Sequence, residues 1–70
     1  MKPANYMDLV YRQEVIVNAS KKELESIGID DEISGKGALI NGFYKTGYVE
    51  IKIGDITYDI VPDYLQTHEN

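Results

Sequence analysis

Hydrophobic and polar residues alternate along two neighbouring stretches of the chain, 48–53 and 56–61, and Gly54-Asp55 separates them. Such alternation is typical of strands with one buried face, and glycine at the first position of a two-residue loop supplies the positive φ of a type II′ turn. The pattern therefore predicts a β-hairpin. The side chains expected on its buried face are Val49, Ile51, Ile53, Ile56, Tyr58 and Ile60.

The two-residue turn also predicts which residues face one another on the outer side of this hairpin. Glu50 is expected opposite Asp59, in a pair without hydrogen bonds where side chains come closest, and Tyr48 is expected opposite Val61. Carboxylates placed in this way repel one another, and a binding partner would explain the arrangement. On an open strand face without a visible hollow, the pair is not expected to do acid-base chemistry.

A short helix is predicted over residues 21–27. Ser20-Lys21-Lys22-Glu23 fits a capping box, in which the serine hydroxyl and the glutamate side chain each accept a hydrogen bond from a backbone N–H at the start of the helix. Gly28 fits the left-handed position after the helix, with Leu24 and Ile29 at the two sites whose contact accompanies a Schellman ending. Two turns are too few to be stable alone, so the apolar residues of the helix are expected to dock onto the sheet.

The remaining strands are less sharply defined by the sequence. Residues 9–17 are rich in β-branched and aromatic side chains and predict the first strand, and residues 33–40 predict a second, bent strand that contains two glycines. Either Asn41-Gly42 or Lys45-Thr46-Gly47 can form the turn that follows. Both alternatives give an antiparallel meander.

The chain closes with a turn and a short tail. Pro62-Asp63-Tyr64-Leu65 is expected to end the last long strand in a 3₁₀-like turn, and residues 66–70 are expected to form a short edge strand or a tail. Seventy residues suffice for one domain. That domain is predicted over residues 8–66, between a flexible N-terminus at 1–7 and a C-terminal tail at 67–70.

The order of these elements resembles the SH3-like small β-barrels, in which a structured connection, a bent strand, a tight hairpin and a proline-containing turn also follow the first strand. The resemblance implies a mainly β (α+β) fold, a small antiparallel barrel of about five strands with one short helix in the first connection. It also implies that Tyr11, Pro62 and Tyr64 lie where SH3 domains hold proline-rich ligands. The Pro-x-x-Tyr turn of that family is one residue shorter here and the chain has no Trp, so proline-rich ligands are not expected.

Charge narrows the choice of partner. Twelve acidic residues against seven basic ones give the chain a net charge of −5. Nucleic-acid affinity comes largely from clustered Lys and Arg, so direct binding of nucleic acid is not expected, although Phe43, Tyr44 and Tyr48 could stack on bases. The favoured partner is another protein with a basic surface. The plain alternative is a negative charge that serves only solubility.

Several kinds of chemistry lack the residues that they need. The chain has no Cys, and His68, its one histidine, falls in the tail. Asp30-Asp31-Glu32 lacks the alternating ligand spacing of a calcium loop, and Ser34-Gly35-Lys36-Gly37 fails the phosphate-loop pattern. No apolar run is long enough to span a membrane, and no secretion signal follows Met1. We therefore expect a soluble, cytoplasmic, non-enzymatic protein without cofactor or metal and without a membrane partner.

These observations predict a small protein-binding module that acts through an acidic and aromatic sheet face. An aromatic residue beside charge is the usual makeup of an interface anchor. The alternative is an acidic inhibitor of the phage or mobile-element type, which mimics nucleic acid and blocks a basic site on a nucleic-acid-handling protein. An exposed edge strand could also pair two copies into a homodimer. The residues expected to make contact are Tyr44, Tyr48, Glu50, Asp59 and Val61, with Asp30, Asp31 and Glu32 as a secondary acidic region.

Overall fold

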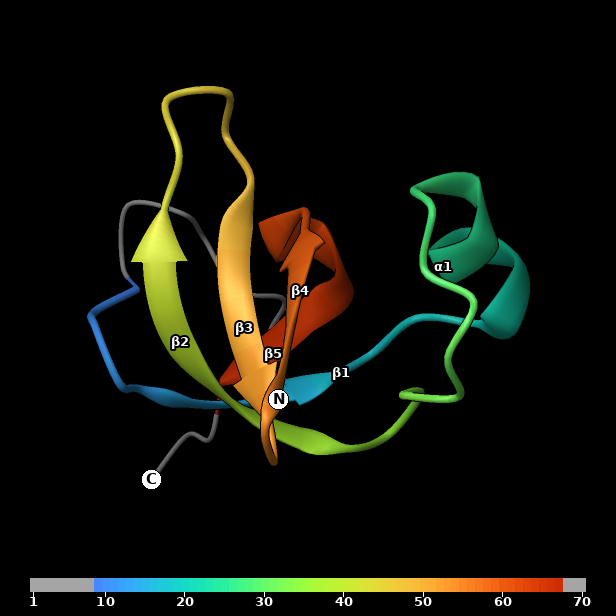
Figure 1. Cartoon of the computed structure of the whole chain (residues 1–70), viewed down its shortest axis with the longest axis horizontal. Coiled ribbons are helices and arrows are strands. Elements are labelled where there is room, and N and C mark those ends of the chain that lie inside the picture. The colour runs from blue at the N-terminus through green and yellow to red at the C-terminus, as the bar shows by residue number, and fades with distance from the viewer. Residues whose placement is uncertain (1–8, 68–70) are drawn as a thin grey trace.

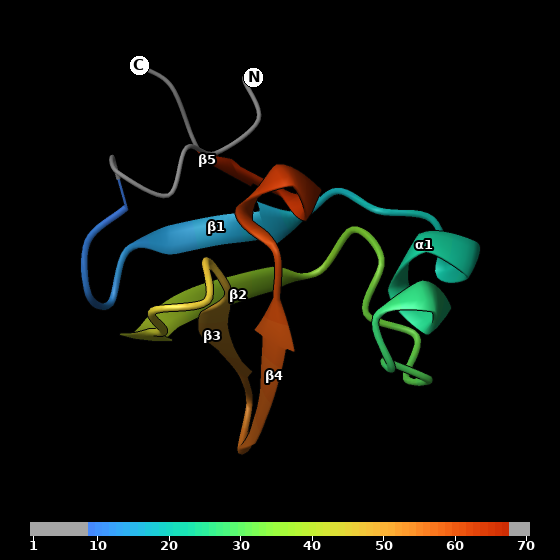
Figure 2. The ribbon, with the colours of Figure 1, turned by 90° about the horizontal axis from the view of Figure 1, so that it is seen from above.

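Five antiparallel strands form one sheet in the computed structural model, which describes residues 9–67 (Figure 1). The strands lie in the order β4-β3-β2-β1-β5, and Figure 2 shows the sheet strongly twisted, with β1 running across the direction of β4. The prediction of a mainly β fold with one short helix in the first connection is confirmed. The sheet is open rather than a closed barrel, because β4 and β5 are its two edges and do not pair. The elements are β1 (Glu14–Val17), α1 (Lys21–Ser26), β2 (Gly37–Phe43), β3 (Val49–Ile53), β4 (Ile56–Ile60), the 3₁₀ turn η2 (Pro62–Tyr64) and β5 (Leu65–Thr67).

The hairpin of β3 and β4 has the predicted register, which includes Glu50 opposite Asp59. Gly54 has a φ of 61° and Asp55 does not have a positive φ, as a type II′ turn requires. Val49, Ile51 and Ile60 are fully buried, as predicted.

Ile56 contradicts the prediction for this face, because 54% of its side chain is exposed. It directly follows the turn at the tip of the hairpin, where the strands extend beyond the core. Ile53 and Tyr58, which lie next to it, are only partly buried. The alternating pattern therefore identified the correct face but overestimated how far the core reaches.

The predicted capping box and Schellman ending are both present at α1. The Ser20 hydroxyl accepts a hydrogen bond from the Glu23 N–H at 3.1 Å, and the Glu23 carboxylate accepts one from the Ser20 N–H at 2.9 Å. At the other end, the Ile29 N–H donates to the Leu24 carbonyl at 2.9 Å, and Gly28 has a φ of 87°. The helix ends at Ser26, one residue earlier than predicted.

The first strand is shorter than the predicted 9–17, because a tight turn occupies its first half. The Gln13 N–H donates to the Val10 carbonyl at 3.1 Å, and Arg12 in between has a positive φ of 66°. β1 begins only at Glu14. At the other end of the chain, β5 pairs with β1 and extends to Thr67, while the predictions for residues 1–8 and 68–70 lie outside the described residues.

The second strand is displaced from the predicted 33–40 to Gly37–Phe43. A turn precedes it, in which the Lys36 N–H donates to the Ile33 carbonyl at 3.1 Å and Gly35 has a φ of 77°. Of the two turns left open by the sequence, the chain uses Lys45-Thr46-Gly47. Asn41 and Gly42 lie inside β2, where the register with β3 shifts at a β-bulge.

The strands of the sheet supply most of the hydrophobic core, and Leu9 and the connection that joins β1 to β2 supply the rest. This connection contributes Leu24 from α1 and two residues that follow it, Ile29 and Ile33. No polar or charged side chain within residues 9–67 is buried, so the chemistry of this part of the molecule is at its surface. No helix in this part has the length and apolar character that a membrane span requires. The core consists of Leu9, Val15, Val17, Leu24, Ile29, Ile33, Ala38, Ile40, Val49, Ile51, Ile60 and Leu65.

Candidate functional site

A groove runs between the end of α1 and the turn that joins β2 to β3. Its volume is about 610 Å³, within the range of roughly 300–1,000 Å³ typical of ligand sites. It passes over the start of β3 and the end of β4. The sequence led us to expect no hollow on this face, and that expectation is wrong. The groove is lined by Ile27, Tyr44, Lys45, Thr46, Tyr48 and Asp59.

The turn between β2 and β3 places two tyrosines on the same side of the groove. The Tyr44 N–H donates to the Tyr48 carbonyl at 3.0 Å, and the Gly47 N–H donates to the Tyr44 carbonyl at 3.1 Å. Gly47 has a φ of 89°, which permits this tight turn. The two aromatic residues therefore stand at the base of one short loop, with Tyr44 39% exposed and Tyr48 partly buried.

Glu50 is held by two hydrogen bonds from side chains. One carboxylate oxygen accepts from the Asn41 amide nitrogen at 2.5 Å, and the other accepts from the Tyr44 hydroxyl at 2.8 Å. Asn41 reaches Glu50 because the bulge in β2 places an extra residue at this point, and bulges commonly redirect side chains in this way. The hydrogen bonds, Asn41's first and Tyr44's second, lower the pKa of Glu50 below its ordinary value.

The Tyr44 hydroxyl interacts with both carboxylates of the predicted pair. Its hydrogen bond to Glu50, with smaller contributions from partial burial and from the negative charge of Asp59, raises the pKa of Tyr44 to about 12. The Tyr44 hydroxyl is protonated at neutral pH and donates its one proton to Glu50, beside the negative charge of Asp59. This donor reduces the repulsion that the sequence predicts between Glu50 and Asp59.

The structure assigns different positions to the two carboxylates. Glu50 is partly buried and fixes Tyr44, whereas Asp59 is exposed and lines the groove. Within residues 9–67, neither carboxylate forms an ion pair with Lys or Arg. Lys45 also lines the groove, but it does not contact either carboxylate as an ion pair.

The remaining predicted contact residue on the sheet, Val61, does not line the groove. It follows the last pair of the β3–β4 ladder and is partly buried at the start of η2. The residues implied by the SH3 resemblance also lie elsewhere, because Tyr11 is 59% exposed in the first turn, Pro62 is buried and Tyr64 packs against the core.

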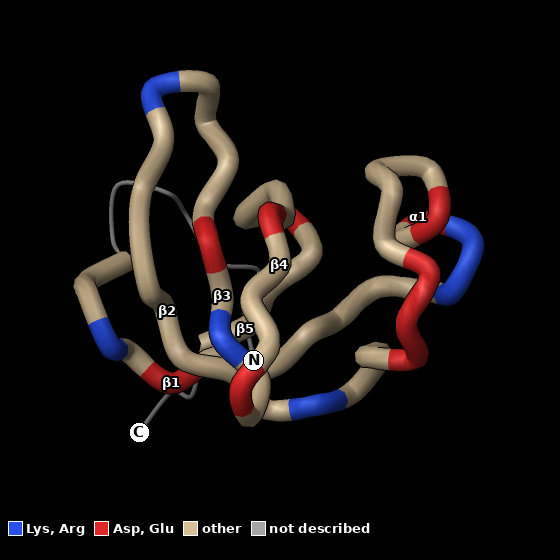
Figure 3. The backbone as a smooth tube through the Cα atoms, in the orientation of Figure 1, with Lys and Arg blue, Asp and Glu red and all other residues tan. Residues whose placement is uncertain are grey.

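The secondary acidic region lies in the loop after α1, and one of its residues contacts the hairpin. The Tyr58 hydroxyl donates to the Asp31 carboxylate at 2.6 Å, and this bond raises the pKa of Tyr58. Asp30 and Glu32 are exposed. Figure 3 shows acidic positions following one another from α1 into this loop. Within residues 9–67, no three or more His, Asp or Glu residues are grouped to hold a metal ion.

Sequence reasoning missed four residues of this site. Ile27 comes from the end of α1, and Lys45 and Thr46 come from the turn whose position was ambiguous in the sequence. Asn41, the partner of Glu50, belongs to the Asn-Gly pair that was an alternative turn. A choice between the two turns would have found Lys45 and Thr46. Docking of the apolar residues of the helix onto the sheet was predicted, but the sequence does not show that Ile27 would lie beside the hairpin.

Comparison of the chain with protein-family models, with characterised proteins and with solved structures gives no significant match. The resemblance to SH3-like barrels therefore stays a prediction.

Proposed function

We propose that this chain is a non-enzymatic protein-binding module that holds a basic segment of a partner protein in the groove between α1 and the β2–β3 turn. The observation that carries the proposal is the combination of Tyr44, Tyr48 and the exposed Asp59 in one groove, with no cation of residues 9–67 paired to the carboxylates. Tyrosines supply large contact areas at low cost in conformational entropy. Unneutralised carboxylates favour a partner of opposite charge.

A partner Arg or Lys side chain fits the chemistry of this groove. Its charged group would pair with Asp59, and its aliphatic part would lie on Ile27 and on the tyrosine rings. Guanidinium groups stack on aromatic faces, so arginine suits the site better than lysine.

Two features support a binding role over a catalytic one. The pKa of Glu50 is lowered, whereas a general acid or base that works near neutral pH needs a carboxyl pKa raised toward 7. The second feature is that its carboxylate oxygens already accept hydrogen bonds from Asn41 and Tyr44. We also propose a cytoplasmic location, which fits a chain without cysteine.

The test is capture of the partner from lysate of the native host, followed by affinity measurements with the captured protein. Tyr48→Ala removes an aromatic wall, and Asp59→Lys replaces the carboxylate that lines the groove with a cation. Each is expected to weaken binding at least about tenfold, as central interface residues commonly do. Asp55→Lys is the matched control, because Asp55 is equally acidic but lies at the tip of the hairpin, outside the groove. Binding that is unchanged in both groove variants would refute the proposal.

A second candidate is the acidic inhibitor that mimics nucleic acid, and the row of acids from α1 into the next loop favours it (Figure 3). Mimicry spreads the contact over many charges, so affinity should fall steeply with salt and the partner should be displaced by DNA or RNA. A groove anchored by tyrosines predicts a modest salt dependence and no displacement. The same captured complex therefore separates the two candidates.

A further inference from the structure

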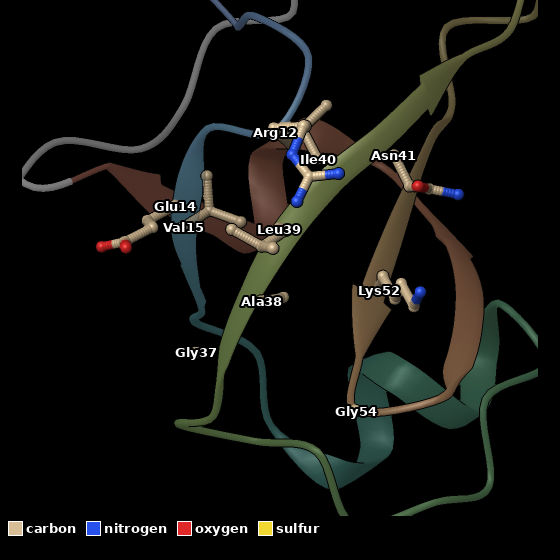
Figure 4. A pocket seen from close by; sticks show the side chains of 10 residues that line it. All are labelled: Arg12, Glu14, Val15, Gly37, Ala38, Leu39, Ile40, Asn41, Lys52 and Gly54. Atoms are coloured by element: carbon tan, nitrogen blue, oxygen red, sulfur yellow. The ribbon is translucent and has the colours of Figure 1, made fainter.

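A second hollow lies on the outer face of the sheet across β1, β2 and β3 (Figure 4). Its volume is about 540 Å³, and it shares no lining residue with the groove described above. Two of the seven basic residues of the chain, Arg12 and Lys52, line it. The full lining consists of Arg12, Glu14, Val15, Gly37, Ala38, Leu39, Ile40, Asn41, Lys52 and Gly54.

The register of the sheet places the charged residues around an apolar centre. Leu39 lies opposite Lys52 on one side and opposite Glu14 on the other, so all three side chains share the outer face. In Figure 4 the Arg12 side chain lies over β2, and the Glu14 carboxylate points away from both cations.

Neither cation is neutralised by a contact within residues 9–67. Lys52 and Arg12 form no ion pair there. The Arg12 guanidinium lies 6.0 Å from the centre of the Tyr11 ring, a contact that orients the side chain and leaves its charge in place. In a chain of net charge −5, two unpaired cations in one hollow indicate a local site for an anion.

The backbone at Arg12 is strained. Arg12 is the one non-glycine residue within 9–67 that has a positive φ, and it occupies a turn position where Gly or Asn is usual. Two hydrogen bonds to β2 hold this turn in place, from the Arg12 N–H to the Ile40 carbonyl at 2.6 Å and from the Ile40 N–H to the Gln13 carbonyl at 2.9 Å. Strain of this kind is common where a side chain must be held for a ligand.

Gly37 has no side chain and so leaves part of the hollow open. The fold itself does not require glycine at this position. A Cβ atom added at Gly37 would meet only the Val15 carbonyl oxygen, at 4.0 Å, and its φ is not positive. Neither packing nor backbone conformation therefore requires glycine at this position. A side chain there would fill space beside Leu39.

We propose that this hollow binds a small organic anion, a carboxylate or phosphate group carried on an apolar body. Arg12 and Lys52 hold the anionic group, since a guanidinium can give two parallel hydrogen bonds to either oxyanion. The apolar body covers the partly buried Leu39, in the space that Gly37 leaves open. The size of the hollow suits a small molecule.

The test is titration of the full chain at low salt with three probes. Amide chemical shifts measured by NMR report the binding. Phenyl phosphate and benzoate carry a ring and differ in the anionic group, so they distinguish a phosphate ligand from a carboxylate ligand. Inorganic phosphate lacks the apolar body. We expect at least one ring-bearing probe to give saturable shifts centred on Arg12, Leu39 and Lys52, with at least about tenfold tighter binding than inorganic phosphate, which corresponds to about 1.4 kcal/mol.

Four variants decide whether the hollow is the site. Arg12→Ala and Lys52→Ala should each weaken binding of the ring-bearing probe at least about tenfold, and Gly37→Val should block it by filling the hollow. Lys21→Ala is the matched control, because it removes one positive charge on α1, away from the hollow. Shifts that do not saturate, or equal losses in Arg12→Ala and Lys21→Ala, would overturn the proposal. None of these residues lines the first groove, so either outcome leaves the proposed protein-binding function to its own test.

Discussion

One hydroxyl group organises the acidic side of the hairpin. The Tyr44 hydroxyl donates to Glu50 at 2.8 Å, and the negative charge of Asp59 is close enough to help raise the pKa of Tyr44, so one neutral donor lies beside both opposed carboxylates. The sequence shows the two carboxylates and their register but not this donor, because Tyr44 reaches them from a different strand pair. Tyr44, which the sequence predicts as a contact residue for a binding partner, therefore also holds Glu50 in place.

The first prediction concerns Tyr44→Phe, which removes the donor and keeps the ring. The pKa of Glu50 should rise toward its ordinary value, because the second of its two stabilising hydrogen bonds is lost. A carboxyl pKa that is lowered in the folded state adds stability above the unfolded pKa, and this stability is lost as pH falls through the folded pKa. The acid-induced loss of stability should therefore be smaller in the variant than in the wild type.

Carboxyl-detected NMR titration of Glu50 and urea unfolding at several pH values measure these two effects. Tyr48→Phe is the matched control, because it removes a hydroxyl from the same groove without touching Glu50. An unchanged Glu50 titration in Tyr44→Phe would contradict the role given to this hydroxyl.

The second prediction concerns the strained backbone of Arg12. A left-handed conformation costs an L-residue about 1–2 kcal/mol, which glycine largely avoids. Arg12→Gly should therefore unfold at higher urea concentration than Arg12→Ala, with a difference of about 1 kcal/mol in the free energy of unfolding. Both variants lose the guanidinium, so their difference reports the backbone alone. Equal stability of the two would show that the turn is not strained.

At the scale of elements, the sequence predicted best where a signal fits within a few consecutive residues. The Gly54-Asp55 turn fixed the register of β3 and β4, and Ser20 and Gly28 marked the two ends of α1. The starts of β1 and β2 were wrong, because turns at Arg12 and at Gly35 interrupt stretches whose composition favours strands. Composition describes the average preference of a stretch and cannot locate a single residue with positive φ.

The groove could be predicted only in part for a related reason. Tyr44, Tyr48 and Asp59 belong to neighbouring strands or to the turn between them, so the meander alone brings them close. Ile27 reaches them through the docking of α1, which the sequence predicts without showing where on the sheet the helix docks. The bulge that turns Asn41 toward Glu50 is also set by the pairing of β2 with β3 rather than by β2 itself.

The third prediction concerns the start of α1, the element that carries Ile27 into the groove. Ser20→Ala removes the side chain that accepts from the Glu23 N–H, and loss of such a cap costs about 1 kcal/mol. Urea unfolding should show this loss. Ser26→Ala is the control, because the Ser26 hydroxyl bonds only to a carbonyl within the helix and alanine favours helix. A similar effect of both substitutions would contradict a special role for the capping box.

At the scale of the whole molecule, the two hollows differ in their balance of charge. The groove beside α1 has Asp59 and Lys45 in its lining and the Glu50–Tyr44 pair next to them, whereas the hollow on the sheet has two cations, Arg12 and Lys52, and one carboxylate, Glu14. The chain as a whole remains negative at −5. A basic partner would therefore be attracted by the overall field and by the groove, while a small anion must bind against the overall field. The second site accordingly needs two cations close together.

The last prediction tests whether this negative field has a measurable cost in the free protein. Asp59→Asn removes one of two carboxylates that lie opposite one another, and like charges so placed destabilise a sheet by about 0.5 kcal/mol. In about 10 mM salt, where charges interact over about 30 Å, the variant should therefore be more stable than the wild type. In about 1 M salt the interaction range shrinks to about 3 Å, and the gain should largely disappear. Asp55→Asn is the control, because it makes the same change in net charge at the tip of the hairpin, where no carboxylate lies opposite. Urea unfolding of both variants at the two salt concentrations separates the effect of local repulsion from the effect of total charge. Equal gains in the two variants would assign the cost to total charge, whereas a gain confined to Asp59→Asn would show that the acidic groove is maintained against its own repulsion, as a site for a cationic partner must be.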